Sequence, residues 1–214
     1  MSSIKRELSL LKPLLTSWKE VIKEYAERSP DDCAYWYGER PQVGFLSVAA
    51  WRLKDEKGNK GVALEEWGTT KGSHEESSYG RNDLWIGWGK KGFSIEAKHC
   101  WCSINKSEEV IKKDLQACIA KAKDSARRMI VSDEDKLSRR LAAVFVSAVW
   151  KEDRPPVDSS RKKAKALKLW EKICKKQADT GLVEIVSDNP PMATEPSDAE
   201  CIGIALLLFE VKSK

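Results

Sequence analysis

The ten residues 141–150 read LAAVFVSAVW, and this nearly unbroken apolar run constrains the fold more than any other stretch. A strand covered by protein on both faces has this pattern, whereas a strand with one face in water alternates apolar and polar residues. The run is far shorter than the roughly 20 apolar residues that a membrane-spanning helix needs. It therefore predicts a central strand between two packed layers, and 214 residues are enough to build such a core.

The rest of the chain supplies alternating helices and strands around that run. We expect helices at residues 4–28, 35–53, 107–130 and 160–177, and strands at 62–67, 83–88, 93–101, 182–186 and 202–211. Pro13 predicts either a kink in the first helix or a short first helix that ends near Lys12. Residues 69–79 and 187–200 are expected to be loops. The order predicts an α/β (α+β) fold, a mixed central β-sheet flanked by helices, in a single domain of residues 1–214.

Charged residues interrupt the expected strand at residues 93–98, whose sequence is FSIEAK. Side chains alternate along a strand, so Glu96 and Lys98 point to one face while Phe93, Ile95 and Ala97 point to the other. A hairpin at residues 89–92 would bring Asp83 on the preceding strand close to this pair. Two carboxylates and one ammonium group are therefore expected at one end of a hairpin.

Such a group suits a hard divalent cation such as Mg²⁺ or Mn²⁺, because carboxylate oxygens are the ligands these ions prefer. A zinc centre with three histidines is impossible, because the chain has only two His. A C-x-C pair at Cys100 and Cys102 without a second pair is a weak zinc signal. A cation held by Asp83 and Glu96 would polarise a phosphate, and Lys98 would orient or activate water, which suits phosphodiester hydrolysis.

At these residues the chain resembles the PD-(D/E)XK nuclease superfamily, which has the restriction-endonuclease-like fold. The signature corresponds to Asp83, a gap of 13 positions, and then Glu96-Ala97-Lys98. Asn82 stands where that signature has proline. The expected order of elements from residue 35 to 150 (helix, three strands, helix, strand) is also similar to the family core. The segments at 4–28 and 157–212 would be additions to this core.

The resemblance implies a metal-dependent endonuclease that acts on DNA, with RNA not excluded. Asp83 and Glu96 would bind Mg²⁺ or Mn²⁺, and Asp83, Glu96, Lys98 and Glu39 would be the catalytic residues. Glu39 matches the additional acidic residue of the family, a role for which Glu65 and Glu66 compete. Gln116 is the candidate for a polar residue on the following helix. The resemblance also implies a place in bacterial or phage (antiviral) defence or in DNA repair, and a homodimer is possible.

Simpler explanations of these residues stay open at the level of sequence. Glu96 and Lys98 could form a solvated pair on an edge strand. Glu39 could be a carboxylate favoured in the first turn of a helix, and Gln116 a surface residue. Arg81 is a candidate either for phosphate contact or for pairing with a loop acid. The main alternative function is a catalytically inactive nuclease-like module that binds nucleic acid or a partner protein.

The excess positive charge lies in one segment of the chain. The whole chain carries a formal charge of +5, but residues 151–177 hold ten Lys or Arg against four Asp or Glu, which leaves −1 for the rest. On a helix at 160–177, one stripe of basic side chains consists of Arg161, Lys165, Lys168, Lys172 and Lys175. This stripe is either a solvated face or a binding face for nucleic-acid phosphates; of its members, Arg161, Lys165, Lys168 and Lys172 are the candidate nucleic-acid-binding residues.

The remaining residues carry less specific information. Six cysteines without framework spacing, and an N-terminus without a signal-peptide pattern, predict a cytoplasmic protein with reduced thiols and no membrane partner. Most of the nine tryptophans lie at apolar positions and are expected in the core. His74 and His99 belong to no motif and are expected to be structural or surface residues.

Overall fold

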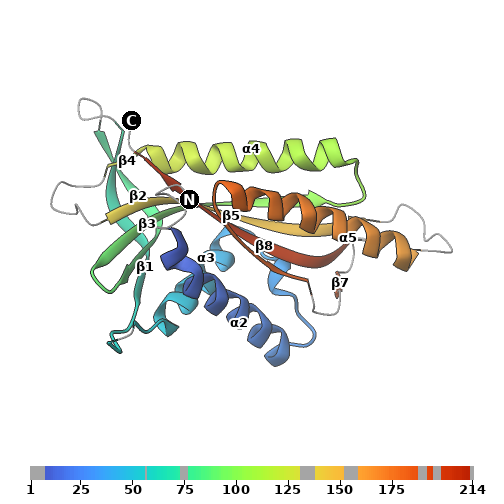
Figure 1. The fold of residues 1–214 in the computed structure, drawn as a ribbon, viewed down its shortest axis with the longest axis horizontal. Helices are drawn as coiled ribbons and strands as arrows, with labels where there is room; N and C mark the ends of the chain where they lie inside the picture. Colours follow the sequence, from blue (N-terminus) through green and yellow to red (C-terminus); the bar gives the residue numbers. More distant parts are fainter. Residues whose placement is uncertain are drawn as a thin grey trace.

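A computed structural model describes residues 8–55, 57–72, 77–130, 138–151, 159–187, 192–194 and 199–212 of the chain. Figure 1 shows one twisted β-sheet with helices on both faces. The helices are α2 (Lys12–Arg28), α3 (Glu39–Arg52), α4 (Glu108–Arg127) and α5 (Ser159–Lys175), with short 3₁₀ segments η1 (Ser9–Leu11), η2 (Ala34–Trp36) and η4 (Lys176–Asp179). The strands are β1 (Val62–Gly72), β2 (Ser77–Trp88), β3 (Lys91–Ser103), β4 (Met129–Ile130), β5 (Ser138–Lys151), β6 (Leu182–Val186), β7 (Met192–Thr194) and β8 (Ala199–Val211).

The described strands form one mixed sheet in the order β4-β1-β2-β3-β5-β8-β6, with β7 paired to β8. Strands β1, β2 and β3 are consecutive antiparallel neighbours. Strand β5 is parallel to β3, and α4 makes the crossover between them. The predicted fold class, a mixed sheet flanked by helices, is therefore confirmed.

The apolar run of residues 141–150 is the centre of this sheet, as its sequence predicts. It forms most of β5, which lies between β3 and β8. Leu141, Ala143 and Phe145 belong to the core under α2 and α3, whereas Ala142 and Val144 belong to the core under α4 and α5. Both faces of β5 are thus covered, which explains why apolar residues occupy successive positions.

Several boundaries differ from the sequence prediction; for example, the helix expected at 35–53 begins at Glu39. Residues 69–79 are not one loop, because β1 continues to Gly72 and pairs there with Ser77, the first residue of β2. A backbone ladder can form between strands whose side chains are polar, so hydropathy alone does not reveal this extension. The helix predicted at 107–130 ends at Arg127, and Met129–Ile130 becomes the short strand β4. Part of the loop predicted at 187–200 is strand β7.

Local signals set the beginnings of two helices. Pro13 lies in the first turn of α2, where its missing N–H costs no hydrogen bond, so α2 is not kinked there. Residues 4–7 of the predicted first helix lie outside the described residues. Ser107 is the N-cap of α4, and its hydroxyl accepts a hydrogen bond from the amide of Val110 at 3.5 Å.

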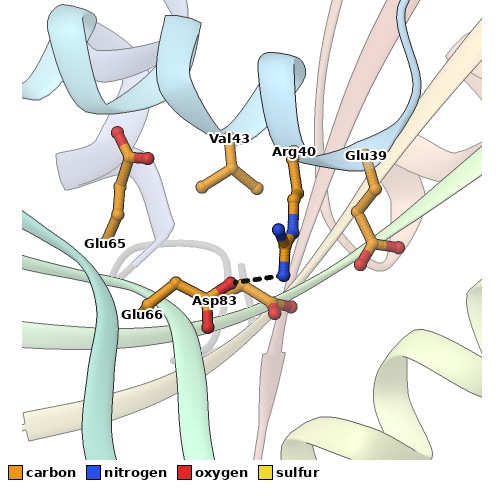
Figure 2. A pocket seen from close by; sticks show the side chains of 6 residues that line it. All are labelled: Glu39, Arg40, Val43, Glu65, Glu66 and Asp83. Carbon is orange, nitrogen blue, oxygen red and sulfur yellow. Dashed lines mark ion pairs between the residues drawn. The ribbon is translucent and has the colours of Figure 1, made fainter.

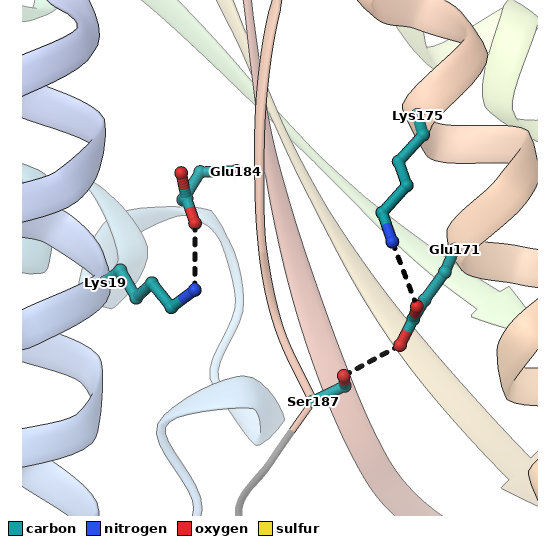
Figure 3. Close-up of polar contacts among 5 residues, drawn as sticks. All are labelled: Lys19, Glu171, Lys175, Glu184 and Ser187. Atoms are coloured by element: carbon teal, nitrogen blue, oxygen red, sulfur yellow. Dashed lines mark hydrogen bonds and ion pairs between the residues drawn. The ribbon is translucent and has the colours of Figure 1, made fainter.

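Polar contacts attach the C-terminal elements to both helical layers (Figure 3). Lys19 of α2 is 3.1 Å from Glu184 of β6. On α5, Glu171 accepts a hydrogen bond from Ser187 at 2.8 Å and pairs with Lys175 at 3.3 Å. Strand β6 and the residue after it are thereby tied to α2 and to α5. Within the described ranges, no helix has the length and apolar character needed to cross a membrane.

Candidate active site

Strands β2 and β3 separate at the point where the predicted site residues lie. The last pair of their ladder is Leu84↔Ile95, so Asp83 and Glu96 would form the next pair. Beyond this point β2 stays paired with β1, and β3 stays paired with β5. We call this point, where Asp83 and Glu96 follow the last β2–β3 pair, the fork.

At the fork, the side chain of Asp83 takes the place of a backbone hydrogen-bond acceptor that β2 no longer supplies to β3. Its Oδ2 atom accepts a hydrogen bond of 2.7 Å from the amide of Ala97. This bond satisfies an N–H group of β3 and fixes the Asp83 carboxylate beside Glu96-Ala97-Lys98. The fork thus places the predicted aspartate against the predicted E-x-K segment.

Lys98 connects the fork to the first turn of α3. Its Nζ atom lies 3.4 Å from both carboxylate oxygens of Glu39 and donates a hydrogen bond of 2.6 Å to the carbonyl of Ala97. The side chains of Lys98 and Glu39 are 31% and 34% exposed, so the pair is half-buried and open to a ligand. Glu39 and Lys98 are 59 positions apart in sequence, and only the folded chain brings them together.

The pKa of Glu39 reflects the position of its carboxyl group. Burial raises this pKa above its ordinary value, and the nearby charge of Asp83 raises it further. The ammonium of Lys98 and the backbone amide of His99 act in the opposite direction. Glu39 is therefore under the electrostatic influence of both Asp83 and Lys98, as expected for members of one site.

A cavity of about 330 Å³ opens beside the fork, between α3 and strands β1 and β2 (Figure 2). Four carboxylates line it, together with one arginine and one valine: Glu39, Glu65, Glu66, Asp83, Arg40 and Val43. Glu39 and Asp83 thus lie on the same cavity as Glu65 and Glu66, the two other candidates for the additional acidic residue. Of the three, Glu39 is the one whose carboxylate contacts Lys98 in this structure.

Glu66 has an unusual backbone conformation at the wall of this cavity. Its φ angle is +52°, and it is the one residue other than glycine with a positive φ in the described part of the chain. The β1–β2 register places it opposite Asp83. Its carboxylate lies 3.5 Å from Arg40 and 3.5 Å from Arg81. Left-handed backbone is costly for a residue with a Cβ, and such strain concentrates at functional sites.

Replacing Glu66 by glycine tests this backbone strain. We expect the unfolding free energy of Glu66→Gly to exceed that of Glu66→Gln by about 1 kcal/mol, because glycine adopts a positive φ without steric cost. Glu66→Gln is the reference because both variants lose the charge that faces the arginines. The matched pair at the neighbouring residue, Glu65→Gly and Glu65→Gln, should show the opposite order by about 0.5–1 kcal/mol. Urea unfolding measures all four, and the same order at both positions would contradict the assignment of strain.

The solvated-edge explanation for Glu96 and Lys98 is wrong. Beyond the fork β3 is paired, among the described strands, only with β5, but Glu96 is only 3% exposed and Lys98 is paired with Glu39, so the two do not form a solvated pair. A carboxylate in such a position is costly unless it has partners or changes its protonation state. The burial of Glu96 next to the fork is therefore typical of a functional carboxylate.

Other predicted residues lie away from the cavity. Gln116 is exposed on α4, where its amide donates a hydrogen bond of 3.2 Å to Gln177 of η4. Arg81 pairs with Glu66, which belongs to strand β1 rather than to a loop. The candidate nucleic-acid-binding residues are exposed on α5, which packs on the sheet face opposite α3; they are Arg161, Lys165, Lys168 and Lys172. The structure does not bring this basic stripe to the cavity wall.

Sequence reasoning missed a polar chain behind the site. His99 Nε2 lies 3.0 Å from the hydroxyl of Ser147, and this hydroxyl donates a hydrogen bond of 2.7 Å to the carbonyl of Tyr35. Gln42 on α3 is fully buried and donates to the carbonyl of Ala34. These contacts fix η2 and the start of α3, and hence Glu39. The serine inside the apolar run of residues 141–150 was the available signal.

The donor set at the fork fits a magnesium-like ion better than zinc. Mg²⁺ typically takes one or two protein carboxylates and keeps several waters, which Asp83 and Glu96 could satisfy. In the described residues, no group of three or more His, Cys, Asp or Glu side chains is arranged to hold a metal ion. Burial raises the pKa of Cys102 to about 12, so its thiol stays neutral and is a poor zinc ligand.

Comparison with known proteins gives no match for this chain, whether with family models, with curated proteins or with solved structures. The geometry of the fork and the cavity is therefore the basis for assigning a function.

Proposed function

We propose that the protein is a Mg²⁺-dependent nuclease that hydrolyses phosphodiester bonds of DNA, with an endonuclease as the expected type. One observation carries the proposal: the carboxylate of Asp83 binds the amide of Ala97, next to the ammonium of Lys98, which lies 3.4 Å from Glu39. Three elements, α3, β2 and β3, thus meet at the fork, beside a cavity that residues of α3, β1 and β2 line. These are the residues that the resemblance to the PD-(D/E)XK superfamily assigned.

The order of the surrounding elements supports the same proposal. Helix α3 is followed by the antiparallel strands β1, β2 and β3, then by α4 and by β5, which is parallel to β3. The resemblance implies this succession of helix, three strands, helix and strand. It also implies that the site lies where the second and third strands carry their acidic residues.

Each residue has a chemical role in the proposed reaction. Asp83 and Glu96 would hold Mg²⁺ or Mn²⁺, which would polarise the phosphate and lower the pKa of the attacking water. Lys98 would orient that water, and its positive charge would oppose the negative charge that develops on the phosphate. Glu39 would hold the ammonium of Lys98 at the cavity. The hydrogen bond from Ala97 would keep Asp83 in place.

The wider setting is also part of the proposal. The exposed lysines and arginine of α5 would bind backbone phosphates through a salt-dependent electrostatic attraction. The six cysteines are all free, which supports a reducing compartment such as the cytoplasm. A role in antiviral defence or DNA repair, activity on RNA, and a homodimer are further parts of the hypothesis that the experiments below can separate.

Cleavage assays with Asp83→Asn test the proposal. The wild-type protein should nick or linearise plasmid DNA, or cut single-stranded DNA, in the presence of Mg²⁺ or Mn²⁺. Asp83→Asn should lower the rate at least about 100-fold, because the amide can still accept the Ala97 hydrogen bond but loses the charge that binds the cation. Glu109→Gln, at an exposed carboxylate in the first turn of α4, is the matched control and should keep full activity.

Two outcomes would contradict the nuclease proposal. Equal cleavage by wild type and Asp83→Asn would show that the activity comes from elsewhere. If the wild-type protein binds DNA but does not cleave it, and calorimetry detects no Mg²⁺ or Mn²⁺ binding, the inactive module becomes the better hypothesis. Loss of the metal isotherm in Asp83→Asn would support the enzyme.

A further inference from the structure

A cluster of three aromatic rings lies next to the fork, on η2 and the second half of β3. The rings of Trp36 and Trp101 have centroids 5.4 Å apart and an angle of 64° between their planes. The ring of His99 packs against Trp101 at 4.5 Å and 75°. Because these contacts are edge-to-face, the rings do not cover one another as a parallel stack would.

Trp101 is exposed on the part of β3 beyond the fork, where only β5 of the described strands pairs with it. Its exposure is 46%, whereas Trp18 and Trp170 are fully buried in the two cores. The expectation that most tryptophans of this chain lie in the core fails at Trp51, Trp67 and Trp101, which are all exposed. What distinguishes Trp101 is that its exposed ring is continuous with the rings of Trp36 and His99 next to the candidate site, and a contiguous exposed surface of this kind marks an interaction site.

Buried hydrogen bonds hold the aromatic cluster in place. His99 is bound through Ser147 to the carbonyl of Tyr35, the residue before Trp36. Ser147 is completely buried, so this polar chain is shielded from water. Both sides of the cluster, β3 and η2, are therefore fixed to the same internal hydrogen bonds, and a ligand would meet a surface that is already ordered.

The cluster is also continuous with the candidate active site. His99 follows Lys98 directly, and its backbone amide is near enough to Glu39 to lower the pKa of that carboxyl group. Trp101 is three residues beyond Lys98 on β3, which corresponds to about 10 Å along a strand. Side chains alternate along β3, so the side chains of Lys98 and Trp101 leave the strand on opposite faces. Because β2 no longer pairs this edge of β3 and the Lys98 ammonium lies beside Glu39 of α3, one or two nucleotides that pass the open edge could reach both a phosphate site at Lys98 and the aromatic ring.

We propose that Trp101, supported by Trp36 and His99, stacks against an unpaired nucleobase of the nucleic acid bound at the fork. This inference rests on the proposed function and specifies its substrate as a single-stranded or locally unpaired chain. An aromatic ring can stack on a base of any identity, because every base has a π-face. The positive charges of Lys98 and of Arg40, which is 88% exposed, would face the adjoining phosphates.

Binding of labelled oligonucleotides by the full chain in a chelator tests stacking apart from cleavage. Fluorescence anisotropy should show that Trp101→Ala weakens binding of a single-stranded oligothymidylate by about 5- to 100-fold, the range expected for one base–aromatic stack. An abasic oligonucleotide of equal length keeps the phosphates but has no bases, so Trp101→Ala and the wild-type protein should bind it with equal affinity. Trp101→Phe should restore most of the affinity for the oligothymidylate.

Trp51→Ala is the matched control, because Trp51 is 52% exposed on α3 and should leave binding unchanged. An equal loss for Trp51→Ala, an equal loss with the abasic chain, or no oligonucleotide binding would overturn the inference. An oligouridylate arm separates RNA from DNA as the source of the base. If Trp101→Ala loses affinity only for the chain that has bases, but the wild-type protein shows no metal-dependent cleavage, the stacking surface is supported and the nuclease proposal is contradicted. If the wild-type protein cleaves DNA but Trp101→Ala binds the oligonucleotide as tightly as wild type, the nuclease proposal is supported and the stacking inference is contradicted.

Discussion

Lys98→Met is expected to lower DNA cleavage by about 10²- to 10⁴-fold, the range for loss of a group that assists proton transfer or stabilises developing charge. Methionine keeps a long unbranched side chain but removes the ammonium that lies 3.4 Å from Glu39. DNA binding in a chelator should change only slightly, because many other basic residues remain. The measurement is single-turnover cleavage of plasmid DNA with Mg²⁺.

The matched control for this experiment is Lys113→Met, at an exposed lysine of α4. It should cleave at the wild-type rate. The double variant Lys98→Met, Glu39→Gln checks whether the loss comes only from the carboxylate that Lys98 leaves behind. If the double variant recovers activity, or if Lys98→Met stays within a few-fold of wild type, Lys98 does not have the proposed role.

The second large effect concerns His99 and acid stability. Burial lowers the pKa of His99 from 6.5 to about 4. Ser147 donates its only hydroxyl hydrogen to Tyr35, so Nε2 of His99 is the donor in their contact and Nδ1 is the nitrogen left to take up a proton. The folded state therefore disfavours the charged imidazole.

The sign of the pH dependence follows from this lowered pKa. Below pH 6.5 the unfolded chain binds a proton at His99 more readily than the folded chain, so stability falls as the pH decreases. The stabilisation of the folded state that comes from neutral His99 is complete above pH 6.5 and is lost progressively as the pH falls towards 4. His99 should account for about 2–3 kcal/mol of this loss, given about 1.4 kcal/mol per pKa unit.

Urea unfolding of wild type and His99→Gln over pH 4–7 measures this contribution. Glutamine keeps an amide that can reach Ser147 but does not titrate, and the carboxyl groups titrate in both proteins. The difference in unfolding free energy should therefore move in favour of His99→Gln by about 2–3 kcal/mol as the pH falls from 7 to 4. If the unfolding free energies of the two proteins change in parallel with pH, His99 has the same pKa in the folded and unfolded states.

Local patterns in the sequence predicted the elements that depend on local physics. The apolar run at 141–150 forms the central strand β5. The helix expected from residue 107 begins there, with Ser107 as its N-cap. The spacing of Asp83 and Glu96 predicted that a hairpin brings them close, and in the structure Asp83 contacts the amide of Ala97 where the β2–β3 ladder ends. Periodicity and capping are properties of neighbouring residues, so they can be read without the fold.

Features that depend on distant contacts could not be predicted in the same way. The choice of Glu39 over Glu65 and Glu66 as the partner of Lys98 depends on where α3 begins relative to β3. The positive φ of Glu66 has no local signature, because glutamate rarely adopts it. His99 belonged to no motif, and its importance follows only from the burial of Ser147.

The left-handed backbone at Glu66 also affects how the molecule can associate with copies of itself. In the described part of the chain, the outer side of β1 is paired only by β4, at Thr70 and Lys71. The preceding part of this edge carries exposed apolar side chains, including Leu64 and Trp67. A long, regular, apolar edge invites strands of other molecules and leads to aggregation. By breaking the regular backbone between Leu64 and Trp67, Glu66 makes this edge a poor template for intermolecular β-sheet growth.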